Sequence, residues 1–330
     1  MGRGNSIEQT LAERAGLPFV AVPAAPVRGA GPVRLVVNVA NLVRGTYRAA
    51  GALRRLGPGA IFATGGYVSV PVVVAGWLLR IPSLIYLPDM EPGLAVRALA
   101  RIATRVAVTA QEAARHFRAA KVIVTGYPVR EEFLALDRAA ARRALSLSDD
   151  KVVLVFGGSR GASALNKAVE GALEEILELA QLVHVCGEGD YPALSARRAS
   201  LPADKQARYR LFAYLHDLPA AVVAADLVVS RAGASVLGEF PAAGVPSILV
   251  PYPYAGRHQM VNARYLADHG AAIVIENDRV GADLLPAVRS LLADDARREA
   301  MRENARRLAH PDAAHALARA LRALPAGKGV

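Results

Sequence analysis

The sequence of 330 residues is poor in cysteine and in aromatic residues, and each scarcity excludes a class of site. Cys186 is the only cysteine, so the chain can form neither an intramolecular disulfide nor a cysteine-based zinc cluster. It ends the apolar run LVHVC, which favours a buried structural thiol. Aromatic residues make up 5% of the chain, which argues against the stacked aromatic platforms that bind single-stranded nucleic acid.

Long apolar runs are also lacking. The best candidate, VPVVVAGWLL at residues 70–79, is followed by Arg80 and Pro82. A membrane-spanning helix needs roughly 18 to 20 apolar residues, so this run is too short. No secretory signal opens the sequence. We therefore expect a soluble, cytoplasmic protein. The length of 330 residues suggests two domains of ordinary size, and the 53% of hydrophobic residues argues against disorder.

Negative charge is scarce in the first part of the chain. Residues 1–130 contain 16 Lys and Arg but five Asp and Glu, whereas residues 131–330 contain 24 residues of each sign. The whole net charge of +11 therefore lies in the first part, which predicts an anionic partner there. Nucleic acid and an anionic membrane surface are the two candidates. A general bias towards arginine is the alternative, but it does not explain the asymmetry.

Strand-like and helix-like runs alternate along the chain, which predicts α/β domains with parallel sheets. So many strands need two sheets. The predicted strands are residues 18–23, 60–65, 83–88, 105–109, 121–126, 152–156, 182–186, 210–215, 226–230, 247–253 and 271–276.

The charge balance changes close to Pro128, so we predict an N-terminal domain at 1–130 and a C-terminal domain at 131–310. We expect the amphipathic helix within 311–330 to complete the N-terminal domain. A doubly wound domain opens with an apolar strand and a glycine-rich turn, whereas the first 17 residues here are polar and helical. The opening unit of the N-terminal domain is therefore expected to be missing.

Four glycine-rich or acidic turns follow predicted strands, where open α/β sheets bind their ligands. They are TGGYVSVP (64–71), LPDMEPGL (87–94), GGSRGASALN (157–166) and SRAGASVLGEF (230–240).

The third and fourth of these turns place small residues at a helix start, where backbone N–H groups and the helix dipole can bind an anion. Ser159 and Ser235 add hydroxyl donors. Glu239 follows one turn into the second helix, where its carboxylate can accept two hydrogen bonds from a ribose diol. Each turn alone could be ordinary turn chemistry, but together they favour a site for a nucleotide diphosphate.

The segment 251–272 offers a further pair of polar side chains. Gln259 and Asn262 are three residues apart on a predicted helix, so both can face one ligand. His258 has no second His, Cys or Asp at ligand spacing. We therefore expect neither a metal site nor a cofactor.

As a set, these motifs resemble the MurG family. The resemblance covers GGSRGASALN, ADLVVSRAGASVLGEFPAAGVPSILVPYP and HQMVNARYLADHGAA in the second half, and RAGLPF, GGYVSVP, PGLAVRALARIATRV and TGYPVR in the first. It implies a GT-B glycosyltransferase, with two Rossmann-like parallel-sheet domains facing a cleft. It also implies an inverting transfer of GlcNAc from UDP-GlcNAc to an undecaprenyl-diphosphate-linked muramyl pentapeptide, at the cytoplasmic face of the membrane.

The resemblance also implies site residues. The uracil would contact the backbone at Leu215, and the ribose would contact Glu239. The whole implied donor site consists of Asp89, Arg130, Ser159, Leu215, Ala234, Ser235, Val236, Leu237, Gly238, Glu239 and Gln259. The implied acceptor-side loop consists of Gly65, Gly66, Tyr67 and Ser69.

The chain departs from the family pattern at two places. Asp89 stands where the family usually has an asparagine, so an amide donor is replaced by a negative charge. This departure leaves open a related transferase with another lipid acceptor, such as a diacylglycerol. The family's first motif, G-G-T-G-G-H, is not found, and the catalytic residue stays unassigned because the expected base lies there. A truncated, donor-binding protein without activity is therefore a further alternative.

The segment 33–56 predicts a membrane-facing helix. Val36, Val39 and Val43 share one helical stripe, Arg44 and Arg48 lie along it, and Trp77 follows in the next helical run. An interfacial helix of this kind buries apolar side chains among lipids while its arginines bind anionic head groups. The alternative is a core helix with a solvated basic face. Because no nucleic-acid-reading motif is present, we favour the membrane surface over nucleic acid as the anionic partner.

Overall fold

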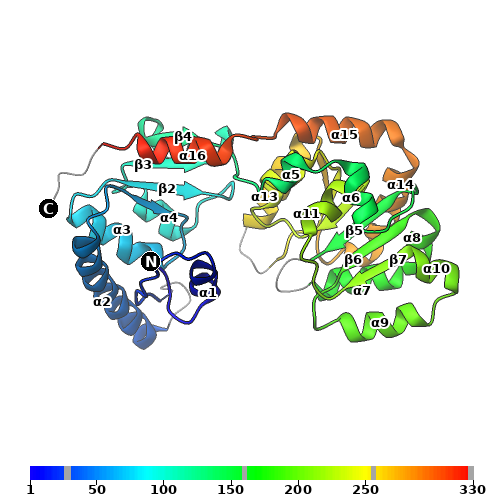
Figure 1. Cartoon of the computed structure of the whole chain (residues 1–330), viewed down its shortest axis with the longest axis horizontal. Helices are drawn as coiled ribbons and strands as arrows, with labels where there is room; N and C mark the ends of the chain where they lie inside the picture. The colour runs from blue at the N-terminus through cyan, green and yellow to red at the C-terminus, as the bar shows by residue number, and fades with distance from the viewer. Residues whose placement is uncertain (26–30, 158–161, 254–257, 326–330) are drawn as a thin grey trace. The chain divides into compact units, whose positions relative to one another are not determined.

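The computed structural model describes residues 1–25, 31–157, 162–253 and 258–325 (Figure 1). These residues form two compact units. Unit 1 comprises Met1–Gly126 together with the C-terminal segment from Ala314, and unit 2 comprises Tyr127–Ala313. The division falls a few residues before the predicted boundary at residue 130.

Unit 1 contains a four-stranded parallel sheet whose strands follow one another in chain order. The strands are β1 (Ile61–Ala63), β2 (Ser83–Leu87), β3 (Arg105–Val108) and β4 (Val122–Val124). Its α-helices are α1 (Ile7–Arg14), α2 (Pro32–Leu56), α3 (Ser69–Leu78), α4 (Leu94–Leu99) and α16 (Ala313–Arg322), and short 3₁₀ helices span Gln111–His116 and Ala119–Lys121.

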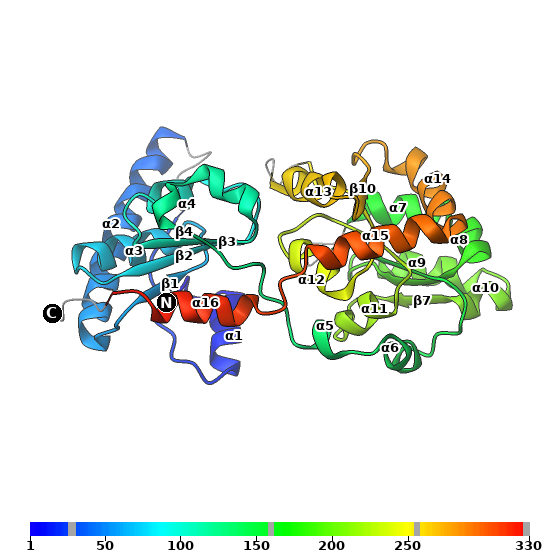
Figure 2. The ribbon, with the colours of Figure 1, turned by 90° about the horizontal axis from the view of Figure 1, so that it is seen from above.

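The C-terminal helix α16 packs on the sheet of unit 1, and Figures 1 and 2 both draw it beside these strands. Leu317 and Ala320 of α16 form a buried cluster with Leu84, Tyr86 and Ala107 of β2 and β3. The C-terminal helix therefore contributes to the core of the N-terminal unit.

The prediction of a strand at 18–23 is wrong. In the described chain this run is paired through a single bridge, between Ala21 and Gly2. Pro18 and Pro23 bracket the run, and proline has no N–H to donate to a ladder. Two backbone hydrogen bonds, from Gly2 N to Val20 O and from Val22 N to Gly2 O, are formed instead of a full ladder.

Unit 2 contains a six-stranded parallel sheet with the order β10-β9-β8-β5-β6-β7. The strands are β5 (Val152–Phe156), β6 (Gln181–Val185), β7 (Tyr209–Phe212), β8 (Leu227–Ser230), β9 (Ser247–Leu249) and β10 (Ala272–Val274). Its helices are α5 (Glu132–Ala135), α6 (Arg138–Ala144), α7 (Ser163–Gly171), α8 (Leu173–Leu179), α9 (Tyr191–Ala199), α10 (Ala203–Arg208), α11 (Leu218–Ala224), α12 (Val236–Ala243), α13 (His258–Asp268), α14 (Val280–Ala293) and α15 (Asp295–Arg307).

The strand order of unit 2 reverses at β5. The chain runs outward from β5 through β6 to β7, and then returns to place β8 on the other side of β5. Open α/β sheets bind ligands at such a switch point, outside the carboxyl ends of the strands. The two parallel-sheet units confirm the predicted α/β fold class.

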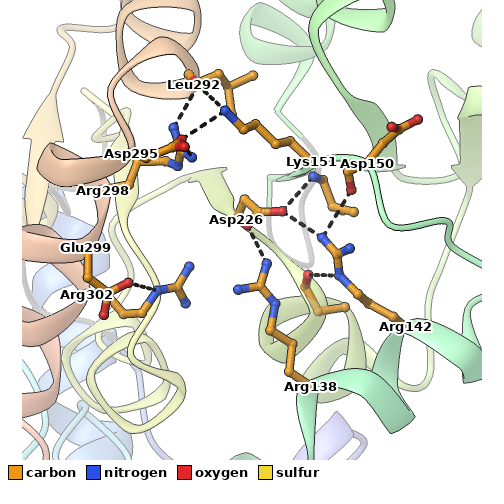
Figure 3. Close-up of polar contacts among 12 residues, drawn as sticks. Arg138, Arg142, Asp150, Lys151, Asp226, Leu292, Asp295, Arg298, Glu299 and Arg302 are labelled. Atoms are coloured by element: carbon orange, nitrogen blue, oxygen red, sulfur yellow. Dashed lines mark hydrogen bonds and ion pairs between the residues drawn. The ribbon is translucent and has the colours of Figure 1, made fainter.

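An ion cluster lies at the amino ends of β5 and β8, on the opposite side of the sheet from the switch point (Figure 3). Asp226, which precedes β8, accepts hydrogen bonds from Arg138, from Arg142 Nη2 at 2.7 Å and from the backbone N of Val152 at 2.9 Å. The cluster ties α6 to the starts of β5 and β8. It therefore stabilises unit 2 at the end of the sheet away from the switch point.

Candidate functional site

A cavity of ≈ 820 Å³ opens in unit 2 at the carboxyl ends of β5, β6 and β7. This volume is in the range of pockets that bind small ligands. Its wall is made mainly by the loops after these strands and by the starts of α7 and α12. The lining residues are Arg130, Phe156, Ala162, Ser163, Val185, Cys186, Gly187, Glu188, Gly189, Asp190, Ala213, Tyr214, Leu215, His216, Leu218, Ser235 and Glu239.

Glu239 brings a carboxylate to the cavity wall from the first turn of α12. Burial raises the pKa of the Glu239 carboxyl above its ordinary value, while a hydrogen bond with the Ser235 side chain and the positive charge of Arg130 lower it. A carboxylate that has lost part of its hydration gains most from ligand donors. The site can therefore bind a group with neighbouring hydroxyls at this point.

Arg130 supplies positive charge to the same cavity. Its side chain is exposed, and its guanidinium lies 5.5 Å from the centre of the Phe133 ring. An exposed guanidinium at a cavity wall can form bidentate hydrogen bonds with a phosphate group.

The loop after β7 forms another part of the wall. Leu215 is half-buried, and the two residues beside it, Tyr214 and His216, are exposed. The rings of Tyr214 and His216 meet edge to face, with centroids 4.8 Å apart. Leu215 was predicted, whereas this aromatic pair was missed.

Several predicted donor residues on α12 do not line the cavity. Val236 and Leu237 are 2% and 3% exposed and belong to the core. Gly238 packs against Tyr127, and a Cβ at this position would lie 2.6 Å from the Tyr127 ring. Ala234 is half-buried beside them. The N–H groups of Val236 and Leu237 donate to the carbonyls of Gly233 and Ala234, within the turn that starts the helix.

Gln259 ties two loops of unit 2 together. Its Oε1 accepts hydrogen bonds from the backbone N of Tyr252 at 2.8 Å and of Ala232 at 3.3 Å. Asn262, one turn later on α13, donates from Nδ2 to the carbonyl of Ala232 at 3.2 Å. Both polar side chains therefore position the loop after β8. Ser159, the predicted serine of the GGSRGA loop, lies outside the described residues.

Both units match known domain families. Residues 152–317 match the glycosyltransferase family 28 C-terminal domain, and residues 1–108 match the N-terminal domain of the same family. A relative from Roseiflexus sp. (strain RS-1) is 45% identical over 93% of this chain and 79% of its own length. One from Desulforudis audaxviator (strain MP104C) is 40% identical over 100% of this chain and 90% of its own length.

Both relatives are named UDP-N-acetylglucosamine–N-acetylmuramyl-(pentapeptide) pyrophosphoryl-undecaprenol N-acetylglucosamine transferase. The crystal structure of Acinetobacter baumannii MurG superposes with a TM-score of 0.75 at 27% identity, covering 97% of this chain and 89% of that one. The chain belongs to the MurG family. The GT-B fold inferred from the sequence motifs is thereby confirmed.

In this MurG-family chain, the predicted acceptor-side loop lies at the carboxyl end of β1. Gly65 and Gly66 adopt φ angles of 90° and 77°, which favour glycine. A Cβ on Gly65 would lie 2.8 Å from Val96 Cγ2, so this glycine also allows close packing. Ser69 Oγ donates to the carbonyl of Gly65 at 2.5 Å, and Tyr67 is half-buried between them.

Asp89 lies in unit 1, half-buried just beyond the carboxyl end of β2. It stands in the same position relative to its strand as the glycine loop does relative to β1. The predicted site residues of unit 1 therefore follow adjacent strands of one sheet.

The predicted membrane-facing side chains are exposed on α2 and α3. The apolar residues Val36, Val39 and Val43 are 69%, 46% and 50% exposed, and Trp77 is 54% exposed. Arg44 and Arg48 are exposed as well. The buried residues of α2 include Gly45, Ala49, Ala52 and Leu53 instead. In the described part of the chain, no helix is both long enough and apolar enough to cross a membrane.

A buried polar network below the cavity was missed by sequence reasoning. It joins Tyr209, His184, Asn166 and Asp190, and it reaches the cavity wall at Cys186. Cys186 is 1% exposed, as predicted, and burial raises the pKa of its thiol to about 11. The thiol is therefore protonated and inert at neutral pH.

Proposed function

We infer that this chain transfers GlcNAc from UDP-GlcNAc to undecaprenyl-diphosphate-linked muramyl pentapeptide, the step from lipid I to lipid II in peptidoglycan synthesis. The observation that carries this conclusion is the similarity to relatives named for that reaction, at 45% and 40% identity over 93% and 100% of the chain. The chain is a UDP-GlcNAc-dependent hexosyltransferase, in agreement with its two family 28 domains.

The donor nucleotide is proposed to occupy the cavity of unit 2. The uracil would lie at the loop after β7, beside Leu215, and the ribose hydroxyls would donate to Glu239. The diphosphate would then lie between Arg130 and the start of α7, where Ala162 and Ser163 line the cavity. Three observations support this placement: the cavity volume, the partly desolvated carboxylate of Glu239, and the positive charge of Arg130 at the same wall.

The lipid-linked acceptor is proposed to bind unit 1, through the glycine loop at Gly65–Ser69 and the loop that carries Asp89. In an inverting transfer, the acceptor hydroxyl attacks the anomeric carbon from the face opposite the departing UDP. The hydroxyl gives up its proton to a base, and UDP leaves with one negative charge more than its diphosphate carried in the sugar nucleotide, so positive charge beside the diphosphate lowers the barrier. Arg130 is the residue that we propose for this role.

The exposed apolar and basic side chains of α2 and α3 are proposed to bind the cytoplasmic face of the membrane. The lipid tail of the acceptor is anchored in that membrane, so a peripheral enzyme must work at its surface. The exposure of Val36, Val39, Val43 and Trp77 supports this proposal, because side chains of this kind bind at a lipid interface when arginines flank them. Arg44 and Arg48 provide the flanking charge.

Transfer of radiolabelled sugar tests the function directly. The full chain is incubated with UDP-GlcNAc or UDP-glucose, and with lipid I, diacylglycerol or no acceptor. We expect lipid-linked product only from UDP-GlcNAc with lipid I. Product from diacylglycerol would instead assign a different acceptor class, which the aspartate at position 89 makes worth testing. UDP binding without transfer to any acceptor would contradict the proposal.

A further inference from the structure

Asn166 is almost fully buried at 2% exposure, yet its side chain forms three hydrogen bonds, two of which reach the cavity wall. It lies in α7, and its Nδ2 donates to the carbonyl of Cys186 at 2.8 Å and to Oδ2 of Asp190 at 2.6 Å. Its Oδ1 lies 3.0 Å from Nε2 of His184 in β6. Cys186 and Asp190 bound the loop after β6, and every residue from 186 to 190 lines the cavity.

The orientation of the Asn166 amide follows from these partners. The carbonyl of Cys186 and the carboxylate of Asp190 are both acceptors, so the NH₂ group must face them. The amide oxygen then faces His184, which must carry its proton on Nε2. The other ring nitrogen, Nδ1, is left as an acceptor for the hydroxyl of Tyr209, 3.0 Å away. Tyr209 and His184 are both 0% exposed.

The four side chains thus form a directed chain of donors, from Tyr209 through His184 and Asn166 to the loop after β6. Every polar atom that these contacts involve has a complementary partner, which makes the arrangement rigid and costly to break. Such a network is more than the packing of a core requires, because apolar side chains would fill the same space without desolvating polar groups. Its free end holds a loop of the cavity and not another core element.

We infer that Asn166, oriented by His184 and Tyr209, is a positioning residue for the donor nucleotide. It holds the two ends of the 186–190 loop at the distances that shape one wall of the cavity. This inference rests on the proposed function, because the ligand that the wall would contact is a nucleoside diphosphate. A preformed wall reduces the ordering cost of binding, so its loss weakens affinity without removing a direct ligand contact.

The test exchanges the amide of Asn166 and the carboxylate of Asp190 by substitution. Asn166→Asp replaces the donating NH₂ by an oxygen that repels Asp190 and the carbonyl of Cys186. We expect the dissociation constant of UDP, measured by calorimetry on the full chain, to rise at least tenfold. Adding Asp190→Asn restores a donor and an acceptor in the reverse order, so the double variant is expected to recover part of that loss. Asp190→Asn alone keeps an acceptor oxygen and provides the reference for the double variant.

A matched control separates positioning from stability. Asp226→Asn weakens the ion cluster at the opposite edge of the same sheet (Figure 3), so it lowers the melting temperature without touching the loop. We expect UDP affinity to be unchanged in this variant. If Asn166→Asp weakens UDP binding no more than Asp226→Asn does at an equal loss of melting temperature, Asn166 is a stabilising residue only and the inference fails.

Hydrogen exchange of the free protein tests the loop without any ligand. We expect the amides of residues 187–190 to exchange at least tenfold faster in Asn166→Asp, and to slow again in the double variant. Unchanged exchange would overturn the positioning role even if UDP binds as proposed. Failure of the wild-type chain to bind UDP would instead overturn the proposed function and leave the exchange result valid.

Two further measurements test the positioning role if Asn166→Asp does not fold. Asp190→Ala removes the carboxylate at the half-buried end of the network, leaves the core intact, and is expected to accelerate exchange of the same amides. Nitrogen NMR of the wild-type protein is expected to show His184 as the Nε2–H tautomer. An Nδ1–H tautomer would require the reverse orientation of Asn166 and would contradict the inference.

Discussion

Replacement of Glu239 by alanine is expected to weaken UDP binding by about tenfold to about a hundredfold. The carboxylate lies at the cavity wall, where burial raises its pKa. A hydrogen bond to a charged group contributes about 1.5–3 kcal/mol, and each 1.4 kcal/mol changes a dissociation constant tenfold. Glu239→Gln keeps one acceptor oxygen, so its loss of affinity should be smaller.

Calorimetry with two ligands identifies what Glu239 contacts. If it binds the ribose diol, wild-type protein should prefer UDP to 2′-deoxy-UDP, and Glu239→Ala should lose most of that preference. Glu303→Ala removes an exposed carboxylate from α15 and is the charge-matched control, with unchanged affinity expected. Equal UDP affinity for wild type and Glu239→Ala, or equal losses for both ligands, would refute the ribose assignment.

The pH dependence of UDP binding provides an independent check on the same residue. Because the pKa of Glu239 is raised, its carboxylate is protonated at a higher pH than an ordinary glutamate. A protonated carboxyl is a poorer acceptor for hydroxyl donors. UDP affinity should therefore fall as pH decreases, beginning above the ordinary glutamate pKa of about 4.5, and this fall should be absent from Glu239→Ala.

Three further predictions concern stability and the membrane. Burial lowers the pKa of His184 from 6.5 to about 4. Between pH 6.5 and pH 4, His184 is therefore protonated in the unfolded chain and neutral in the folded chain. The free energy of unfolding, measured with urea, should therefore fall by about 3 kcal/mol as pH decreases from 6.5 towards 4, with a flatter profile in His184→Gln. Asp226→Asn should lower the free energy of unfolding by about 1–3 kcal/mol, because it removes the partly buried negative charge that Arg138 and Arg142 both contact, and an unchanged urea midpoint would contradict that role. Reversal of charge at Arg44 and Arg48 should reduce sedimentation with vesicles that contain anionic lipid. Each arginine contributes roughly 1 kcal/mol to binding near such a surface, and reversal replaces this attraction by repulsion, so the loss of binding free energy per residue should exceed that value. Binding that is insensitive to salt, or equal on neutral vesicles, would show that these arginines do not mediate it.

Local sequence patterns were sufficient to predict most of the strands. The β-branched runs at β5 and β8 are continuous and apolar because both faces of a parallel sheet are covered, and they form strands as predicted. The run at 18–23 is also apolar but forms a single bridge, since Pro18 and Pro23 bracket it and a strand also needs a neighbour with which to pair. The composition of a segment indicates its preference for a strand, whereas strand pairing depends on whether another strand lies beside it.

One short motif supplies two of the predicted donor residues that line the cavity. Ser235 and Glu239 belong to one loop and helix start, and the structure places both on the cavity wall. Val236 and Leu237 belong to the same motif but point into the core, because successive residues of a helix face different directions. A motif therefore identifies the segment at a site, and the helical turn decides which of its side chains line the cavity.

By itself the sequence determined the alternation of strands and helices, the uneven distribution of charge and the family, since each depends on residues close together in the chain or on a motif set. The tertiary structure decided that Asn166, His184 and Tyr209 meet, because their contact requires β6 to lie between β5 and β7. It also decided that the valine stripe of α2 is exposed, while Gly45, Ala49, Ala52 and Leu53 are buried. A helical period creates two faces in the sequence, but only packing against neighbouring elements selects the face that is buried.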